Sequence, residues 1–303
     1  MLDRAAFDRY LARLAREAGA DYHYATTVTG LETSPDRVEL RVKHRSKDYQ
    51  HQARAVTLAS GFNSPLVAQA GLARGLPFVV GAQTEVEAPV IEVMEIYFGR
   101  EIAPGFFAWL VPTTAGRARV GLLAQHHPGD YLKKLLTTLR EQGKVAEAAG
   151  EICYQGILIK PLPRTSNDRL IVVVTAAGQV KPTTGGGIYY GLIAADIAAA
   201  TLHPALQDNN LTARNLTQYD REWRRRLESE IRQGYQVRQI YNHLSDGQVD
   251  RLFARLAGND QLASFLNDRT VAFDWHSGGL LRLLGQLAAL RLKDFVKRPS
   301  QPS

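Results

Sequence analysis

The sequence predicts a mixed α/β chain with α+β character in its middle, and three observations support this prediction. A helix is followed by alternating strand-like segments over roughly the first sixty residues. Strand-like segments separated by turn residues then extend from Phe78 to about Lys160, which is typical of an antiparallel sheet. Beyond Pro204 the pattern is helical. Together these patterns indicate layered α/β architecture with an inserted sheet and a C-terminal helical region.

The composition is that of an ordinary globular protein. The 303 residues are 45% hydrophobic and 22% charged, which excludes disordered, collagen-like and small disulfide-rich proteins. The formal net charge is +7, but glutamates interleave with the arginines of Arg221–Arg232, so this run predicts a solvated helix face rather than a nucleic-acid surface. A single cysteine, no signal-peptide pattern and no apolar run of about 20 residues favour a cytoplasmic chain that does not span a membrane.

The N-terminal part begins with a helix and continues as strands. Residues 5–18 place apolar side chains at helical spacing, and Gly19 ends the helix. The strand-like segments that follow are Tyr22–Leu31, Val38–Val42 and His51–Leu58. Ser60–Pro65 then breaks the pattern, and Ser64 is expected to cap a helix that starts near Pro65.

The middle of the chain has the pattern of an antiparallel sheet interrupted by one helix, Gly129–Ala149. The expected strands are Phe78–Ala82, Val90–Tyr97, Phe106–Val111, Ala118–Leu123 and Cys153–Ile159. Cys153 opens an apolar strand and is expected to be a small buried side chain. His126 and His127 are expected in a loop, because two adjacent histidines without a third ligand make a poor metal site. We expect no metal.

The most informative unit is a strand, a glycine-rich loop and a helix. Residues 169–174 are a continuous apolar run, typical of a strand buried on both faces. Gly178–Gly187 ends in three consecutive glycines, and the helix Ile188–Leu202 follows. Such glycines allow a ligand to approach the backbone, and the helix start behind them favours an anion or a polarised carbonyl. On spacing alone, a tight packing turn explains the loop equally well.

The C-terminal region is predicted to form helices at 212–244, 246–257, 260–267 and 278–297. Residues 277–298 combine a wide apolar surface with basic residues at the end, namely Arg291, Lys293, Lys297 and Arg298. Two interpretations stay open for this segment. It is either a packing helix or a peripheral membrane contact.

The glycine-rich unit resembles a known motif. Gly178–Ile188 after an apolar strand is similar to the second flavin motif of geranylgeranyl reductases, which are FAD-dependent oxidoreductases with the fold of para-hydroxybenzoate hydroxylase. Other stretches resemble the family in the same order, namely Phe7-Asp8 with Gly19-Ala20, Ala59–Ser64, Glu95–Pro112, Gly121, and Pro161 with Arg164. The resemblance spans about residues 1–202, and the helical region is compatible with it.

This resemblance implies an incomplete three-layer FAD-binding domain with an inserted antiparallel substrate-binding sheet. The implied units are 1–76, the remainder of the FAD-binding domain; 77–165, the sheet; 166–203, the second FAD-binding segment; and 204–303, the helical region. An apolar wall on the sheet and a flavin held by the glycine-rich loop are the parts that such an enzyme needs.

The sequence departs from the family pattern at three places. Members of the family open with a strand and a GxGxxG loop for the FAD pyrophosphate and adenosine; this sequence has no such loop, and Met1 falls well inside the family's first domain. Thr175 replaces the aspartate of the family's "GDAA", and Ser60 replaces that of "ADG". We therefore expect a truncated product, one half of a split enzyme completed by an upstream-encoded N-terminal FAD-binding half, or a homologue that is losing flavin chemistry.

The resemblance also implies a set of site residues. Those expected to bind the cofactor are Thr175, Ala176, Gly178, Pro182, Thr184, Gly185, Gly186, Gly187 and Ile188. Those expected to contact substrate are Tyr97, Phe106, Phe107, Trp109 and Pro112. Hydride transfer to an isolated alkene needs a dry apolar site and a proton donor, for which Tyr97 and Tyr189 are the candidates. The alternative interpretation of Trp109 is plain core, and of Tyr189 and Tyr190 one packed and one exposed ring.

The predicted function is FAD-dependent reduction of the double bonds of a prenyl lipid, incomplete or split as the chain stands. Electrons would come from NAD(P)H or a ferredoxin-like donor. Two alternatives stay open. One is a non-catalytic prenyl-lipid-binding relic that has lost flavin, which Ser60 and Thr175 favour and the intact loop Pro182–Ile188 opposes. The other is a related FAD monooxygenase.

Overall fold

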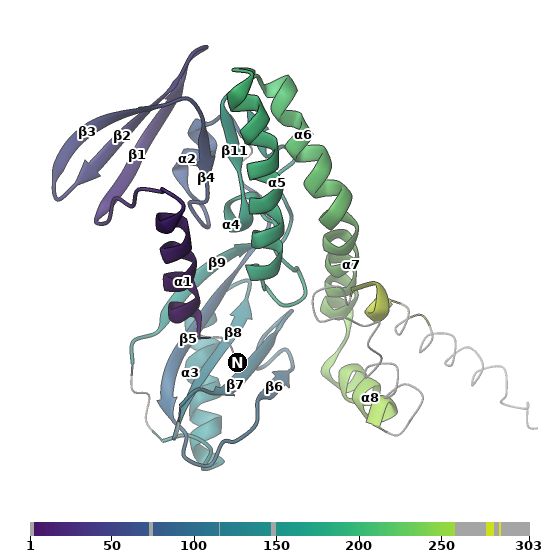
Figure 1. The fold of residues 1–303 in the computed structure, drawn as a ribbon. Helices are drawn as coiled ribbons and strands as arrows, with labels where there is room; N and C mark the ends of the chain where they lie inside the picture. The colour runs from purple at the N-terminus through teal and green to yellow at the C-terminus, as the bar shows by residue number, and fades with distance from the viewer. Residues whose placement is uncertain are drawn as a thin grey trace, which may run out of the picture.

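The computed structural model describes residues 3–72, 75–114, 116–146, 150–257, 277–281 and 285. Three sheets and a series of helices make up this part of the chain (Figure 1), which confirms the mixed α/β class. Strands β1 (Thr26–Thr33), β2 (Val38–His44) and β3 (Lys47–Ala53) form an antiparallel meander. No helix of the described residues is long and apolar enough to cross a membrane.

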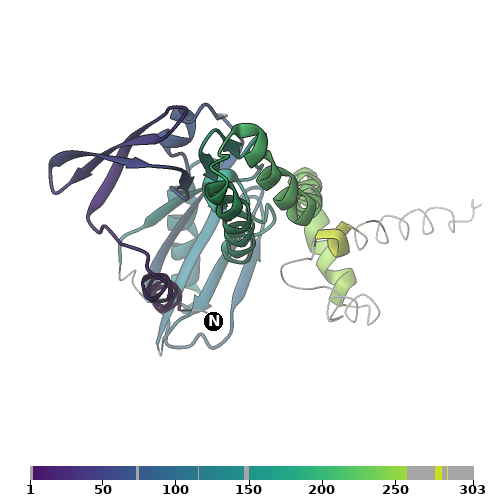
Figure 2. The ribbon, with the colours of Figure 1, turned by 45° about the horizontal axis from the view of Figure 1, so that its top comes forward.

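Helix α1 (Arg4–Glu17) begins and ends as its sequence predicts. The carboxylate of Asp3 accepts the Ala6 N–H at 2.9 Å, and Gly19 follows the helix with φ +95°. No residue of α1 is buried, however, and Tyr10 is 50% and Leu14 40% exposed. Figure 2 shows α1 end-on, on the side of the molecule away from helices α6 and α7. Phe7, Leu11 and Ala15 are half-buried, so the apolar face of α1 is only partly covered.

A small sheet contains the parallel pair expected of an α/β layer. Strands β4 (Val56–Leu58) and β11 (Leu170–Val172) run parallel, and β10 (Ser166–Asn167) pairs with β11. All three residues of β11 are fully buried, as the apolar run predicts, but the strand ends at Val172 rather than at residue 174. Within the described residues β4 has a partner on one edge only. Helix α2 (Pro65–Gln69) follows with the expected Ser64 cap.

The inserted sheet is antiparallel, in the order β6-β7-β8-β5-β9. Its strands are β5 (Phe78–Glu87), β6 (Glu95–Phe98), β7 (Phe107–Pro112), β8 (Arg117–Ala124) and β9 (Cys153–Leu158). Two predictions are wrong here. The segment Val90–Met94 is not strand, since β6 begins only at Glu95, and Val93 is mostly exposed. Cys153 is exposed rather than buried, because it opens an edge strand.

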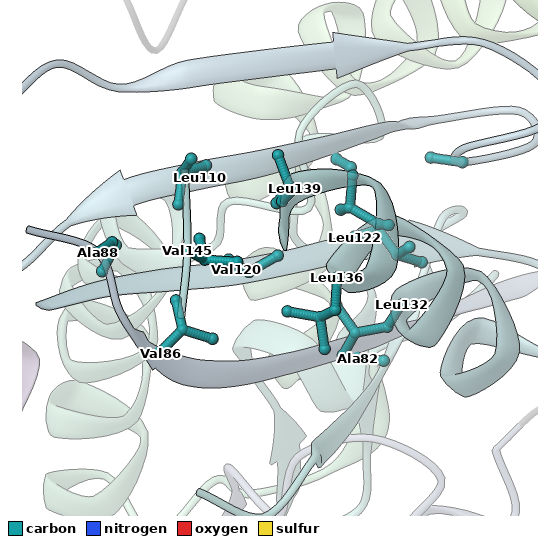
Figure 3. Packing of buried hydrophobic residues seen from close by; sticks show 14 of the residues in the cluster. Ala82, Val86, Ala88, Leu110, Val120, Leu122, Leu132, Leu136, Leu139 and Val145 are labelled. Atoms are coloured by element: carbon teal, nitrogen blue, oxygen red, sulfur yellow. The ribbon is translucent and has the colours of Figure 1, made fainter. Parts of the chain in front are cut away.

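Helix α3 (Pro128–Glu141) covers one face of this sheet (Figure 3). Its leucines pack against alternate residues of β5, β7 and β8; the labelled contacts include Leu132, Leu136, Leu139, Val86, Leu110 and Leu122. The helix is shorter than the predicted Gly129–Ala149, because Gly143 adopts φ +69° just past Glu141 and the last three predicted positions lie outside the described residues.

The opposite face of the sheet carries a second apolar cluster. It consists of Val79, Phe106, Leu123 and Ile159, with Trp109, Ile157 and Tyr235 packed against them. Tyr235 comes from helix α7, so the C-terminal helices rather than α3 reach this face. The sheet therefore has one face closed by α3 and one face turned toward the helical region.

The C-terminal region is helical, as predicted. Its helices are α5 (Ile188–Gln207), α6 (Ala213–Trp223), α7 (Ser229–His243) and α8 (Asp246–Ala257), and a π-helical turn (Arg224–Glu228) joins α6 to α7. Helix α5 runs five residues beyond the predicted Leu202, because Pro204 lies in its last turn and interrupts little of it. The helix expected at 260–267 lies outside the described residues, as does most of 277–298, so the membrane contact stays a prediction.

A buried carboxylate fastens α6 to the small sheet. Asp220 is 7% exposed and accepts the Thr165 N–H and the Thr165 hydroxyl, each at 2.8 Å, and the Ser166 hydroxyl. The indole N–H of Trp223 donates to the same Thr165 hydroxyl at 2.8 Å. Because hydrogen bonds to an ionised group are stronger than neutral ones, this cluster is a main anchor of the helical region.

We expect Asp220→Ala to lower the free energy of unfolding by about 3 kcal/mol or more, because it leaves buried donors of Thr165 and Ser166 without an acceptor. Urea titration monitored by circular dichroism measures the change. The matched control is Asp196→Ala, whose exposed carboxylate on α5 makes only a 3.8 Å ion pair with Arg226. Equal effects of the two substitutions would contradict the proposed anchor.

Candidate functional site

The glycine-rich unit starts with a strained residue. After β11 the chain enters the short helix α4 (Val174–Ala177), whose first residue has φ +60°. This left-handed conformation is rare and costly for a β-branched side chain. Val174 stands where the resembled "GDAA" motif has glycine, the residue that adopts positive φ freely. The backbone conformation thus fits the motif although the side chain does not.

Gly178 ends α4 where only glycine fits. Its φ is +71°, and a Cβ atom would lie 2.7 Å from the Cα atom of Pro161 and overlap the Lys160 carbonyl. The close approach places the loop directly against the chain that follows β9. The predicted cofactor residues shortly before it, Thr175 and Ala176, are half-buried and buried respectively.

A buried glutamine, which the sequence analysis did not single out, holds the loop to α6. The side-chain oxygen of Gln179 accepts the Val174 N–H at 2.7 Å, and its amide nitrogen donates to the Tyr219 hydroxyl at 2.9 Å. That hydroxyl donates in turn to the Val172 carbonyl at 3.2 Å. Burial raises the pKa of Tyr219, so it remains a neutral donor. The chain of bonds holds Val174 in its strained conformation.

The following turn closes on itself. The Lys181 N–H donates to the Gly186 carbonyl at 3.0 Å, and the Gly185 N–H donates to the Lys181 carbonyl at 2.8 Å. The Thr184 hydroxyl accepts the Gly186 N–H at 3.3 Å. Gly185 has φ +71°, and a Cβ atom there would lie 2.9 Å from Ile157 of β9. The turn therefore lies tightly against the inserted sheet.

Helix α5 begins directly behind this turn. Gly187 caps it without a side-chain hydrogen bond, and Ile188 is its first residue. The first N–H groups of a helix have no partner inside the helix, and they carry the positive end of its dipole. Lys181, a buried cation that the prediction omitted, adds positive charge beside Gly186, since its Cε atom lies 2.9 Å from an ideal Cβ at that glycine. The start of α5 is thus suited to a negatively charged or polarised group.

A cavity of about 440 Å³ lies beside α4. The turn residues Phe62, Asn63 and Ser64 line one side of it and Ala176 another, together with parts of α2, β5 and β9. The two segments that resemble flavin motifs, Ala59–Ser64 and the start of the glycine-rich unit, therefore meet at one cavity. The glycines 185–187 do not line it.

Three of the predicted substrate residues lie together on the face of the sheet opposite α3. Phe106 is buried, and Phe107 and Trp109 are half-buried with ring centroids 6.0 Å apart. The Trp109 ring lies across Gly121 of β8, where a Cβ atom would come within 2.5 Å of it. A glycine opposite the tryptophan lets this ring lie flat on the sheet.

Tyr97 and Pro112 are not part of this aromatic face. Tyr97 pairs with Ala108 and packs against the α3 cluster, because side chains alternate along β6 and β7. The same alternation places Pro112 on the side of Leu110. The Tyr97 hydroxyl donates to Glu95 and accepts from the Lys144 ammonium at 3.2 Å. The structure therefore does not bring Tyr97 and Pro112 together with Phe106, Phe107 and Trp109, and their contact with substrate stays a prediction.

The second candidate proton donor lies beside the glycine-rich turn. Tyr189 is on the first turn of α5 and 41% exposed, whereas Tyr190 is fully buried, which confirms the prediction of one packed and one exposed ring.

Pro182 is buried against α7, since a Cβ atom on Gly234 would lie 3.2 Å from its ring. No cluster of three metal-ligating side chains occurs in the described part of the chain.

Sequence comparison places this geometry in a family. No family model matches the sequence. The digeranylgeranylglycerophospholipid reductase of Methanocaldococcus jannaschii is 31% identical over 263 residues, covering 83% of this chain and 67% of the relative. Digeranylgeranylglycerophospholipid reductase 2 of Methanothermobacter thermautotrophicus is 32% identical over 275 residues, covering 86% and 69%. The chain belongs to the geranylgeranyl reductase family. It spans about two thirds of the length of these relatives.

Solved structures support the same fold. A geranylgeranyl bacteriochlorophyll reductase-like protein from Thermoplasma acidophilum superposes with a TM-score of 0.78 at 22% identity, covering 94% of this chain and 75% of that one. The halogenase PltM in complex with phloroglucinol and FAD gives 0.63 at 18%, covering 94% and 63%. This geranylgeranyl reductase homologue therefore has the fold of FAD-dependent proteins, as the resemblance implied.

The residues present fit one part of FAD better than another. The uncapped start of α5, with the closed turn of glycines before it, fits the flavin ring, which carries negative charge when reduced. Thr175 offers a neutral hydroxyl where the family has a carboxylate for the ribityl chain, and Ser60 likewise replaces an acid. The fit is thus carried by backbone groups rather than by charged side chains.

We expect Gly178→Ala to destabilise the protein by about 3 kcal/mol, because it adds both a strained φ and an overlap with the Lys160–Pro161 backbone. Gly19→Ala is the matched control: its φ is +95° but nothing lies within 4 Å, so about 1 kcal/mol is expected. Thermal unfolding of both variants measures the difference. If Gly178→Ala costs no more than Gly19→Ala, the close contact of the loop with residues 160–161 does not exist.

Proposed function

We propose that this chain reduces carbon–carbon double bonds in the prenyl chains of a lipid, with FAD as its cofactor. One observation carries the proposal: the glycine-rich turn lies on the aromatic face of the sheet. A Cβ atom on Gly185 would lie 2.9 Å from Ile157 and 3.3 Å from Leu123, both members of the cluster that includes Phe106 and Trp109. A cofactor at the turn and an apolar chain on the face would therefore be neighbours.

The chemistry divides between the cofactor and the protein. FAD, when bound and reduced, supplies the hydride. The first N–H groups of α5 stabilise negative charge at the turn, and Lys181 supports them. The aromatic face with Phe107 and Trp109 holds the prenyl chain and excludes water. Tyr189, on the first turn of α5, is the proposed proton donor. NAD(P)H or a ferredoxin-like protein is the proposed electron donor.

The names of the relatives support a lipid substrate. Both sequence relatives are named as reductases of digeranylgeranylglycerophospholipid. A lipid of that kind offers isolated double bonds along an apolar chain, which suits an apolar face more than a polar pocket. The likeness to halogenases is at 18% identity and concerns the fold alone, so it does not favour the monooxygenase alternative.

We further propose that a separate N-terminal FAD-binding half completes the site. Strand β4 has one free edge within the described residues, α1 leaves its apolar side partly uncovered, and the cavity beside α4 opens in the same part of the molecule. The outer edge of such a strand presents backbone N–H and C=O groups that another strand can pair with. A segment that adds a parallel strand to β4 would use these open surfaces.

The test is a titration of FAD, followed by the quenching of its fluorescence, with and without an upstream-encoded segment added in trans. Tight binding only with the added segment supports a split reductase, and the complex is then reduced with dithionite and incubated with a geranylgeranyl lipid. The expected product gains two hydrogens per reduced bond by mass spectrometry. Flavin binding without any lipid reduction would contradict the proposed reaction.

A flavin-free lipid-binding protein is the second candidate, and specific observations favour it. Ser60 and Thr175 replace two acids of the family's pattern, and Val174 is strained where glycine would not be. This candidate predicts that FAD fails to bind under both conditions while geranylgeraniol still binds. The same pair of titrations therefore separates the two functions.

We expect Thr175→Asp to tighten FAD binding about tenfold, because an ionised acceptor for the ribityl hydroxyls is worth more than a neutral one. Thr175→Asn is the control, since it offers an acceptor of the same shape without the charge. Fluorescence quenching of FAD, with the completing segment present, gives both constants. An unchanged affinity in the aspartate variant would show that residue 175 does not face the cofactor.

We expect Trp109→Ala to weaken geranylgeraniol binding about tenfold or more and to lower the melting temperature by only a few degrees, because the ring is only half-buried in its cluster. Tyr97→Phe, on the α3 face, should leave lipid binding unchanged. Isothermal titration calorimetry and thermal unfolding measure the two effects. If Trp109→Ala simply unfolds the chain, the alternative of a plain core residue is correct.

A further inference from the structure

Arg238 on α7 is a buried cation without a partner. The residue is 3% exposed, and its Nε and Nη2 atoms are buried with no hydrogen-bond acceptor among the described residues. Burial lowers the pKa of its guanidinium, and Tyr235 opposes that shift. Nearly all buried donors in folded proteins are paired, so two orphaned N–H groups on one side chain call for a reason.

The contacts of Arg238 do not stabilise the fold enough to explain its burial. The guanidinium carbon lies 4.3 Å from the centroid of the Phe106 ring, which is a favourable cation–π contact. Such a contact is weaker than the cost of taking a charge out of water without hydrogen bonds. Glu230, the nearest acid along α7, lies two turns away and accepts the Ser277 N–H. An apolar side chain at 238 would be the more stable choice.

The position of Arg238 connects it to the proposed lipid site. One turn earlier on α7, Gly234 lies against Pro182 of the glycine-rich loop. Tyr235 packs into the aromatic face with Phe106 and Trp109. Arg238 therefore lies where α7 crosses the end of this face, with its guanidinium over Phe106.

A second cation lies close by. The Lys160 ammonium is 4.4 Å from the centroid of the Tyr235 ring. In the described part of the chain no carboxylate is paired with Lys160 or with Arg238. One end of an apolar face thus carries two cations around Tyr235, which is the charge pattern that complements an amphiphile with an anionic head.

We propose that Arg238, assisted by Lys160, binds the phosphate group of a prenyl phospholipid whose chains lie on the aromatic face. The forked N–H groups of arginine match two oxygens of a phosphate, and the orphaned Nε and Nη2 are two such groups. This inference rests on the proposed function and deepens it by naming the side chains that recognise the phosphate group. Arg238 binds and positions the lipid and takes no part in hydride transfer.

The test compares two probes with the same tail, geranylgeranyl monophosphate and geranylgeraniol, on the full chain. Isothermal titration calorimetry gives their affinities, and thermal unfolding gives stability. The variants are Arg238→Met, which removes the charge at similar size, and Arg238→Lys, which keeps the charge without the fork. Arg232→Met is the control, since that arginine is exposed on the same helix.

We expect the native chain to bind the phosphate ester at least tenfold more tightly than the alcohol. Arg238→Met should abolish that preference, leave geranylgeraniol affinity unchanged, and keep or raise the melting temperature, because it removes an unpaired buried charge. Arg238→Lys should retain part of the preference, and Arg232→Met all of it. Lys160→Met should reduce the preference less than Arg238→Met does.

Four outcomes would overturn the inference. One is that Arg238→Met and Arg238→Lys both lose affinity for both probes and melt at a lower temperature, which makes the residue structural. Another is that Arg238→Met loses affinity for FAD but keeps the preference for the phosphate ester, which assigns the guanidinium to the cofactor. The third is stabilisation by inorganic phosphate with no preference between the probes. The fourth is equal binding of both probes by the native chain. Failure of the native chain to bind either probe would instead contradict the proposed function itself.

Discussion

The hydrogen bonds from α6 to Thr165, to β11 and to the glycine-rich loop are the constraint on which the rest of the structure depends. Asp220 and Trp223 bind Thr165, and Tyr219 binds Gln179 and the Val172 carbonyl. Because the π-helical turn continues α6 directly into α7, this anchor also fixes where α7 crosses the sheet. Gly234, Tyr235 and Arg238 reach the site only through it, so a polar cluster remote from the aromatic face sets the geometry of that face.

The two faces of the inserted sheet have different roles, and α3 decides which is which. The face that α3 covers is a dry aliphatic core and holds the Glu95–Tyr97–Lys144 contacts at its rim. The other face carries the larger aromatic rings and meets the glycine-rich turn and α7. A flat-lying tryptophan over Gly121 gives this second face a shape that an extended apolar chain can follow. The proposed substrate site therefore lies on this second face.

The sequence predicted the long elements and the glycine-rich turn before α5 well, since helical periodicity and the run of glycines are local signals. It did not predict which face a strand residue occupies, because that depends on the pairing of β6 with β7: Tyr97 looked equivalent to Trp109 until the register was known. Cys153 was misjudged for the same reason, since an edge strand is defined by its missing neighbour. Arg238 gave no sequence signal, because its lack of a partner is a property of the packed structure.

Two residues break the rules that favour stability, namely Val174 at the start of α4 and Arg238 on α7. Val174 keeps a left-handed backbone without glycine because Gly178 and Gln179, which directly follow α4, bond to its backbone, and Arg238 keeps a charge without an acceptor. Departures of this kind concentrate at functional sites. The conformation at Val174 also bears on the lost acids. The loop keeps a backbone shape that fits the family's motif, although Val174 and Thr175 stand where that motif has glycine and aspartate. The proposed site therefore lacks charge toward the ribityl arm, and we propose that it relies on backbone N–H groups for the reactive ring and on a cation for the head of an acidic lipid.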